Sequence, residues 1–269
     1  MRAAPLSPAL VLVAHGSRDP RAANATRALV RAVAAVRPGV DVRASYLDHA
    51  GPRPGDVLHA LESAGHARAV LVPLLLTAAY HGRIDVPDVL RTARAEGLRM
   101  PVAISQVIGP FDGVVPDLLL SGLLRRLSEV TALPGYGPGA PIGVADAGFD
   151  AVVLAAAGTN DVTARGTVER AAVALGDALG VPSAVAYASA SPPTGAETVA
   201  ALRATGARRI AISGYFLAPG LLYDTVVESA RSAGGVVAVA PPLTDARDIA
   251  RLVLSRADAV TWGGEVLAA

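Results

Sequence analysis

An internal repeat is the feature that most constrains the fold of this chain of 269 residues. VLVAHGSRD in the first half matches VLAAAGTND in the second, and two longer segments match in the same order. The matched segments are 11–19 with 153–161, 41–65 with 182–206, and 68–85 with 208–224. Because the offset stays between 139 and 142 residues, the sequence indicates a tandem duplication of one folding unit.

Each half alternates short aliphatic runs with segments of helical spacing. This alternation predicts a parallel sheet with helices on both faces, which is a doubly wound α/β fold. The expected strands are 9–14, 40–46, 69–75 and 101–105, then 151–156, 183–187, 209–213 and 236–239. A segment rich in proline and glycine separates the halves. We therefore expect similar domains at 1–131 and 149–269, a linker at 132–148, and a cleft between the domains.

The residue types that are absent narrow the chemistry. The chain has no cysteine, which excludes disulfides, thiolate ligands and cysteine nucleophiles. All 24 basic residues are arginine, which excludes a lysine-containing phosphate loop and a pyridoxal Schiff base. No dinucleotide-binding glycine motif follows a predicted strand, so no organic cofactor is expected. A net charge of +1 gives no reason to expect a nucleic-acid partner.

The apolar stretches are too short or too interrupted to be a signal peptide or a membrane helix. Residues 9–14 run straight into polar sequence and are too short for a signal-peptide core. The longest uncharged stretch, 178–196, contains three prolines, so it is not a membrane helix. The expected location is the cytoplasm.

Three polar residues follow the ends of predicted strands in the first half. His15 follows the first strand, Asp48 the second, and His81 lies a few residues beyond the third, at equal intervals of 33 residues. Since ligands bind beyond the carboxyl ends of strands in open parallel sheets, we expect all three at one edge. Two imidazoles and a carboxylate predict a divalent-metal site with open positions, and an imidazole can also act as a base near neutral pH.

The second half serves as an internal control for this prediction. Ala157 takes the place of His15, Ala190 or a neighbour that of Asp48 and His49, and Leu221 that of His81. All five histidines lie in the first half. Side chains that the fold required would have been kept in both copies, so function explains His15 and His81 better than folding does.

Other polar residues near this edge leave alternatives open. His49 adjoins Asp48 and competes with it for the same role, whereas His59 and His66 fit a solvated helix surface. Arg18, Arg53 and Arg83 either bind the carboxylates of an anionic ligand or form salt bridges within the loops. Gly16, Gly82 and Gly158 are expected to mark tight turns.

Three segments of the first half resemble the class II sirohydrochlorin chelatases, the iron- and cobalt-inserting enzymes of siroheme and cobalamin synthesis. They are LVLVAHGSRDPRA, SYLDHAGPRPGDVLHAL and AVLVPLLLTAAYHGRIDVPDVL. The resemblance is strong over residues 10–128 and weaker over 150–258. It implies two chelatase-like domains around a cleft that holds the tetrapyrrole, with the active site in the first half only.

The resemblance also implies residue roles. The catalytic histidines of the family fall on His15 and His81, and these two residues with Asp48 would bind the metal. Asp48 stands where glutamate is common, and its shorter side chain leaves open whether it acts directly or through water. Arg18, Arg53, Arg83 and the loop residues Gly16 and Ser17 would bind the peripheral carboxylates.

The implied reaction is the insertion of a divalent metal into sirohydrochlorin by a lyase that needs no ATP. Iron is favoured over cobalt only because no histidine-rich tail is present. A non-catalytic tetrapyrrole or metal carrier is the alternative, and a dinuclear metal hydrolase is disfavoured because acidic residues at the strand ends are few. The expected assembly is a monomer with an internal pseudo-twofold axis.

Overall fold

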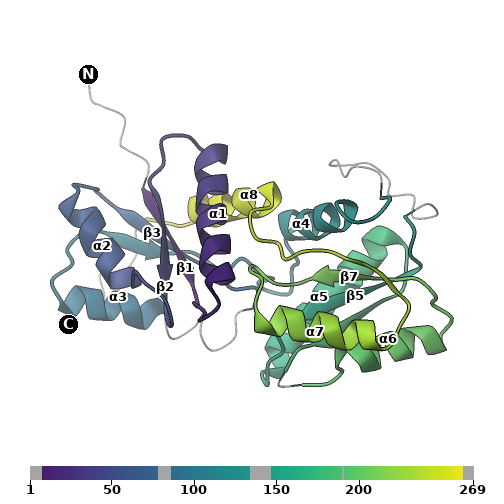
Figure 1. Ribbon diagram of the computed structural model, residues 1–269. Helices are drawn as coiled ribbons and strands as arrows, with labels where there is room; N and C mark the ends of the chain where they lie inside the picture. The colour runs from purple at the N-terminus through teal and green to yellow at the C-terminus, as the bar shows by residue number, and fades with distance from the viewer. Residues whose placement is uncertain (1–7, 78–85, 134–146, 190, 263–269) are drawn as a thin grey trace.

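The structure is a computed structural model, and it describes residues 8–77, 86–133, 147–189 and 191–262. His81, Gly82 and Arg83 lie outside the described residues, as does most of the expected linker. Two α/β units stand side by side, each built on a four-stranded parallel sheet (Figure 1).

The two sheets have the same strand order, as the duplication predicts. In the first sheet the order is β2-β1-β3-β4, and in the second it is β6-β5-β7-β8. The strands of the first sheet are β1 (Ala9–Ala14), β2 (Val42–Tyr46), β3 (Ala69–Pro73) and β4 (Val102–Ile104). Those of the second are β5 (Ala151–Ala156), β6 (Ser183–Tyr187), β7 (Ile210–Gly214) and β8 (Val236–Val239). The doubly wound fold and its duplication are thus confirmed, with strand bounds within two residues of those expected.

The central strands β1 and β3 of the first sheet and β5 and β7 of the second are buried on both faces, which is why their sequences are almost continuous apolar runs. The helices of the first half are α1 (Pro20–Val36), α2 (Pro54–Ser63), α3 (Val86–Ala95) and α4 (Asp117–Ser128). Those of the second are α5 (Val162–Leu179), α6 (Gly195–Ala204), α7 (Leu221–Ser232) and α8 (Arg247–Asp258). Helices α2 and α3 cover the outer face of the first sheet, and α6 and α7 that of the second.

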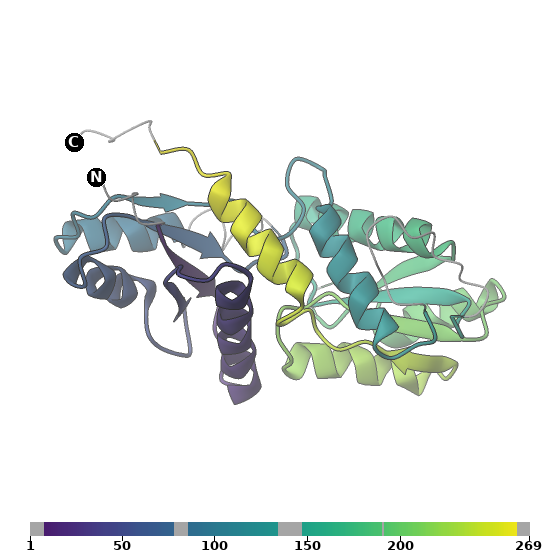
Figure 2. The same cartoon turned by 90° about the horizontal axis from the view of Figure 1, so that it is seen from above.

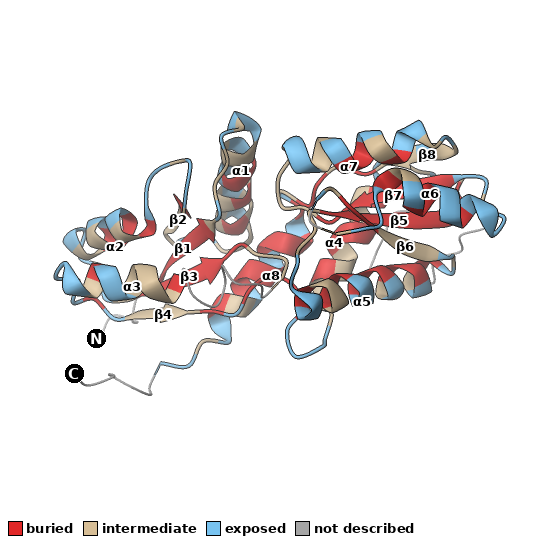
Figure 3. Cartoon of the chain, turned by 90° about the horizontal axis from the view of Figure 1, so that it is seen from below, coloured by how far each residue is buried: buried red, intermediate tan, exposed pale blue. Residues whose placement is uncertain are grey.

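The inner faces of the two sheets share one apolar core. Leu10 and Leu12 of β1 and Val152 and Leu154 of β5 belong to this core, together with residues from α1, α4, α5 and α8. Figure 3 shows the buried residues concentrated in the strands and in the helices between the sheets. The two units therefore pack as one molecule.

The last helix of each half packs on the other half. Helix α4 follows the first sheet in sequence but contacts β7 and α5 of the second unit. Helix α8 follows the second sheet but contacts α1 and β3 of the first. The two exchanged helices also contact each other, and Figure 2 shows them side by side between the sheets. The chain consequently crosses between the units at 105–116 and again at 240–246.

Candidate functional site

The loops after β1 and β2 are joined at the carboxyl edge of the first sheet. The backbone N–H of Leu47 donates to Ala14 O at 2.9 Å, and that of Asp48 donates to His15 O at 2.8 Å. Gly16 makes the junction possible: its φ is +97°, and a Cβ there would lie 1.8 Å from Asp48 O. Only glycine tolerates both this conformation and this contact.

The junction brings His15 and Asp48 together, and it brings His49 with them. The rings of His15 and His49 are edge-on with centroids 6.5 Å apart. His49 Nε2 lies 3.5 Å from Asp48 Oδ2, and the backbone N–H of His49 donates to Asp48 Oδ1 at 2.7 Å. His49 adopts a φ of +57°, an uncommon conformation for a side chain of this kind. The described part of the site is thus two imidazoles beside one carboxylate, all three exposed to solvent.

Asp48 is held in its ionised form. The backbone N–H of His49 lowers the pKa of its carboxyl below the usual value, and the charges of His49, Arg53 and His15 act in the same direction. Arg53 Nη2 lies 3.7 Å from Asp48 Oδ1, and another guanidinium N–H of Arg53 donates to Leu47 O. Carboxylate and imidazole groups are ligand types that divalent transition metals accept.

The second half keeps the backbone of this junction and lacks its chemistry. Ser189 N donates to Ala157 O at 3.1 Å, and Gly158 has a φ of +94° with Ser189 O 1.9 Å from its would-be Cβ. Of the expected candidates, Ala190 or a neighbour, the geometry places the neighbour Ser189 in the position of Asp48. Since alanine and serine maintain the same loop, the fold does not require His15 or Asp48.

A cavity of about 300 Å³ lies between the two halves, and His15 is one of the residues that line it. One wall is made by His15, Gly16 and Ser17 with residues of α1, and the other by residues 216–223, which comprise the loop after β7 and the start of α7. Asp48, Arg18 and Arg53 are absent from the lining. The cavity therefore joins the polar loop of the first half to an apolar segment of the second.

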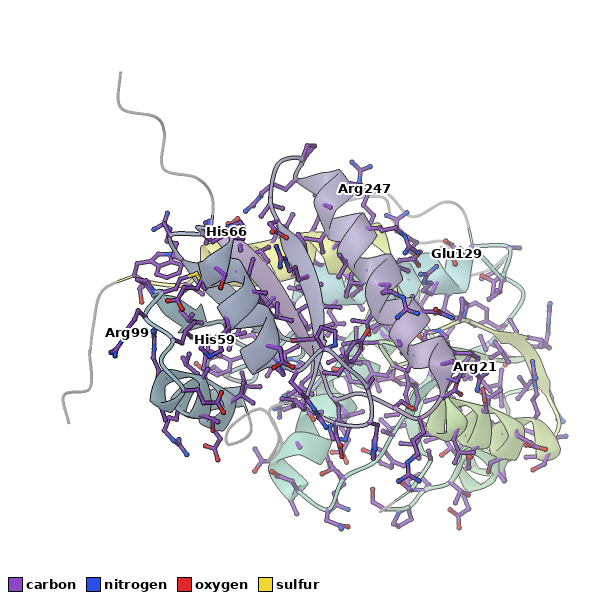
Figure 4. All side chains as sticks on the ribbon, turned by 60° about the vertical axis from the view of Figure 1, so that its left-hand side comes forward. Arg21, His59, His66, Arg99, Glu129 and Arg247 are labelled. Atoms are coloured by element: carbon purple, nitrogen blue, oxygen red, sulfur yellow. The ribbon has the colours of Figure 1, made fainter. Side chains whose placement is uncertain are left out.

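An ion pair joins the two halves next to residues that line this cavity. Arg21, in the first turn of α1, lies 2.6 Å from Asp224 in the first turn of α7 and 2.6 Å from Asp19. Figure 4 shows Arg21 at the start of α1, beside the green helix of the second half. Sequence reasoning missed this pair because its partners are 203 residues apart and neither adjoins a predicted site residue.

The remaining predicted residues have different surroundings. Arg18 is exposed, and its guanidinium pairs with no described residue, whereas Ser17 Oγ accepts a hydrogen bond from Asp19 N at 3.1 Å. His59 and His66, both labelled in Figure 4, are half-buried, do not line the cavity, and lie near Glu62 and Asp41 respectively. Among the described residues no group of three or more His, Asp or Glu side chains is close enough to hold a metal. His81 and Arg83 are outside the described residues.

A second cavity of about 310 Å³ also lies between the halves. The loop after β4, including Ser105 and Phe111, faces Asp161, Thr167 and Arg170 around the start of α5. No histidine lines it. The second half has no counterparts of His15 and Asp48, so this cavity lacks the imidazole that lines the first one.

The sequence matches a known protein family in both of its halves. The family model for CbiX matches twice, at residues 9–124 and 151–260. The sirohydrochlorin cobaltochelatase of Methanosarcina barkeri is 22% identical over 125 residues, which is 44% of this chain and 95% of that protein.

Within the described parts of the chain, no helix combines the length and apolar character that crossing a membrane requires.

The similar solved structures share the whole fold. SirB from Bacillus subtilis with Fe³⁺ superposes with a TM-score of 0.74 at 19% identity, covering 93% of this chain and 94% of that one. The sirohydrochlorin chelatase SirB from Bacillus subtilis subspecies spizizenii in complex with cobalt gives 0.72 at 17% identity, with the same coverage. Since the family model matches both halves over most of their length, the chain belongs to the CbiX family of class II chelatases.

Proposed function

We propose that this protein is a sirohydrochlorin chelatase that inserts a divalent metal into the macrocycle. The observation that carries the proposal is the junction of the loops after β1 and β2. It places His15 and ionised Asp48 together beside the cavity, in the one half that has these residues. The names of the relatives, a sirohydrochlorin cobaltochelatase and a sirohydrochlorin chelatase, support the same substrate.

In the proposed mechanism the metal reaches the macrocycle from one face. His15 and His81 present the cation, and Asp48 orients or completes the site, directly or through a water molecule. Two pyrrole N–H protons leave as the divalent metal enters, so the charge balances. One of the two histidines accepts one of these protons, which requires a neutral imidazole near pH 7, and solvent water accepts the other. ATP has no part in this reaction.

The proposal names ferrous iron as the metal, with cobalt as the alternative. Imidazole and carboxylate ligands bind both ions, so selectivity depends on geometry and supply more than on intrinsic affinity. The cobaltochelatase name of one relative favours cobalt, whereas one similar solved structure, SirB from Bacillus subtilis, holds Fe³⁺. The proposed enzyme is a monomer, since one chain supplies both walls of the cavity. Its proposed location is the cytoplasm.

The test is metallation of sirohydrochlorin followed by absorbance, with ferrous iron, cobalt and nickel compared side by side. We expect many turnovers per protein with iron or cobalt. His15→Ala and His81→Ala should abolish turnover and leave the circular dichroism spectrum unchanged. A single stoichiometric shift in absorbance would show a carrier instead of an enzyme, and undiminished turnover in both variants would refute the assigned site.

A further inference from the structure

Two exposed leucines face the cavity from the second half. Leu221 and Leu222 begin helix α7, line the same cavity as His15, and are 76% and 42% exposed. Leucine side chains gain stability from burial, and the walls of ligand pockets are mostly apolar. The core of the second half does not use these two side chains.

The segment that carries the leucines is firmly held. Tyr223 packs edge-on against Phe216 at 5.6 Å between ring centroids, and its hydroxyl donates to Ala240 O at 2.9 Å. The backbone O of Phe216 accepts from Leu243 N at 2.7 Å. Tyr215, directly before this segment, donates its buried hydroxyl to Leu76 O at 3.0 Å and so ties it to the first half. The leucines are therefore exposed on a fixed support.

The opposite wall supplies polar groups at one end. His15 lies there, and Arg18, three residues along the same loop, has an exposed guanidinium that pairs with no described residue. The ion pair between Arg21 and Asp224 joins the two walls. A ligand that fits this arrangement has an apolar face, a metal-binding centre and an anionic edge.

We propose that Leu221 and Leu222 form an apolar platform on which one face of the tetrapyrrole macrocycle rests while His15 faces its centre. This inference rests on the proposed function and deepens it, because it assigns substrate binding to the half that lacks the metal-handling residues. The carboxylate edge of the macrocycle would pair with Arg18, three residues beyond His15 in the same loop, because a guanidinium pairs well with a carboxylate. Two leucines are too small an apolar surface for a stable protein partner, which needs about 800 Å² on each side.

The experiment measures substrate binding separately from turnover. Sirohydrochlorin without metal is titrated against wild type and the double variant Leu221→Ser/Leu222→Ser, and binding is followed by the quenching of its fluorescence. Val173→Ser and Val237→Ser are matched controls, because both valines are more than half exposed and neither lines the cavity. Cobalt binding by calorimetry and the sedimentation coefficient are measured on the same samples.

The platform predicts roughly 10- to 100-fold weaker sirohydrochlorin binding for the double variant, the loss expected from uncovering one to two leucine side chains. KM should rise more than kcat falls, while cobalt binding, thermal midpoint and sedimentation stay as in wild type and the valine controls. Unchanged sirohydrochlorin binding in the double variant would overturn the platform. A wild-type dimer that the variant converts to a monomer would also overturn it, by showing that the leucines contact a second copy. Failure of the proposed function is a separate outcome, because wild type would then show no metal insertion.

Discussion

Arg53 occupies a helix start at which the second half has threonine. Thr194, its counterpart, caps α6 by accepting from Glu197 N at 3.3 Å, while the Glu197 carboxylate accepts from Thr194 N at 2.7 Å. Arginine has no acceptor with which to cap α2, so the first half gives up the stabilisation of an N-cap at this position. The guanidinium of Arg53 instead contacts Asp48 and Leu47 O, which indicates that Arg53 positions the side chain of Asp48.

Exchanging these two residues separates stability from activity. Arg53→Thr should raise the free energy of unfolding by about 1 kcal/mol through the new cap, and lower kcat several-fold because Asp48 loses its cation. Thr194→Arg should lower stability by about the same amount and leave turnover unchanged. Urea unfolding and metallation rates measure both effects. Normal turnover in Arg53→Thr would assign Arg53 to the loop structure alone.

Gly16 and Gly158 offer a second matched pair at the residue scale. Each has a positive φ and a backbone oxygen less than 2 Å from its would-be Cβ. We expect Gly16→Ala and Gly158→Ala to destabilise the protein similarly, by about 1–3 kcal/mol or more. Only Gly16→Ala should remove metal insertion, since only that junction holds His15 and Asp48. Equal loss of activity in both variants, compared at equal folded fraction, would contradict this.

The site was predictable from sequence where it depends on the ends of strands. His15 and Asp48 follow adjacent parallel strands, so their meeting follows from the topology. The prediction left His49 as a competitor of Asp48, and the structure brings the two side chains within 3.5 Å of each other. The sequence identifies Leu221 only as the residue in the place of His81, because exposure and cavity lining have no signature in a single sequence.

At the scale of elements, α8 is fixed to α1 by a two-pronged ion pair. Arg37, at the end of α1, donates to both carboxylate oxygens of Asp258 at 2.7 and 2.6 Å. This hydrogen bonding lowers the pKa of Asp258 below its ordinary value of 3.8. A carboxyl with a lowered pKa in the folded state stabilises the fold above its unfolded pKa, and the contribution disappears as the pH falls through the folded pKa.

Asp258→Asn tests this contribution. Because both side chains are more than a third exposed, the loss at neutral pH should be small, about 0.2–1 kcal/mol at low salt. The difference between wild type and variant should shrink as the pH is lowered below about 4, and also at high salt. Urea unfolding at several pH values measures it. A difference that is independent of pH would mean that the asparagine disturbs packing and not charge.

The strands and the helix order of each half were predictable because they depend on local apolar patterns and on the repeat. The exchange of α4 and α8 was not. Either helix has an apolar face that would cover either sheet, since the duplication made the two sheets alike. The choice depends on where the crossing segments 105–116 and 240–246 lead the chain, and no periodicity in the sequence records that path.

At the scale of the whole molecule, this exchange makes each unit depend on the sequence of the other half. Arg125 of α4 pairs with the buried carboxylate of Asp248 in α8, and Arg126 of α4 lies 2.7 Å from Asp245. Breaking a largely buried pair by removing one partner is strongly destabilising. The contact between α4 and α8 thus helps to fix the position of one wall of the cavity relative to the other, because α8 packs on α1 and α4 packs on β7.

Two buried leucines allow the exchange to be tested. Leu123 of α4 is 0% exposed and Leu252 of α8 is 3% exposed, and both belong to the core between the sheets. Replacing either by alanine should cost about 2–5 kcal/mol. Since local opening follows local packing, Leu123→Ala should weaken amide protection chiefly in β5 and β7, although α4 belongs to the first half of the sequence.

Leu252→Ala should show the reverse pattern, with protection lost chiefly in β1 and β3. Native-state hydrogen exchange resolved by residue distinguishes the two patterns. If each variant weakened the sheet of its own half, the exchange would be wrong, and each half would be a self-contained unit. If the expected pattern is found, the half that contains His15 cannot be complete without the last helix of the other half, because α1, which carries the wall beside His15, packs against α8.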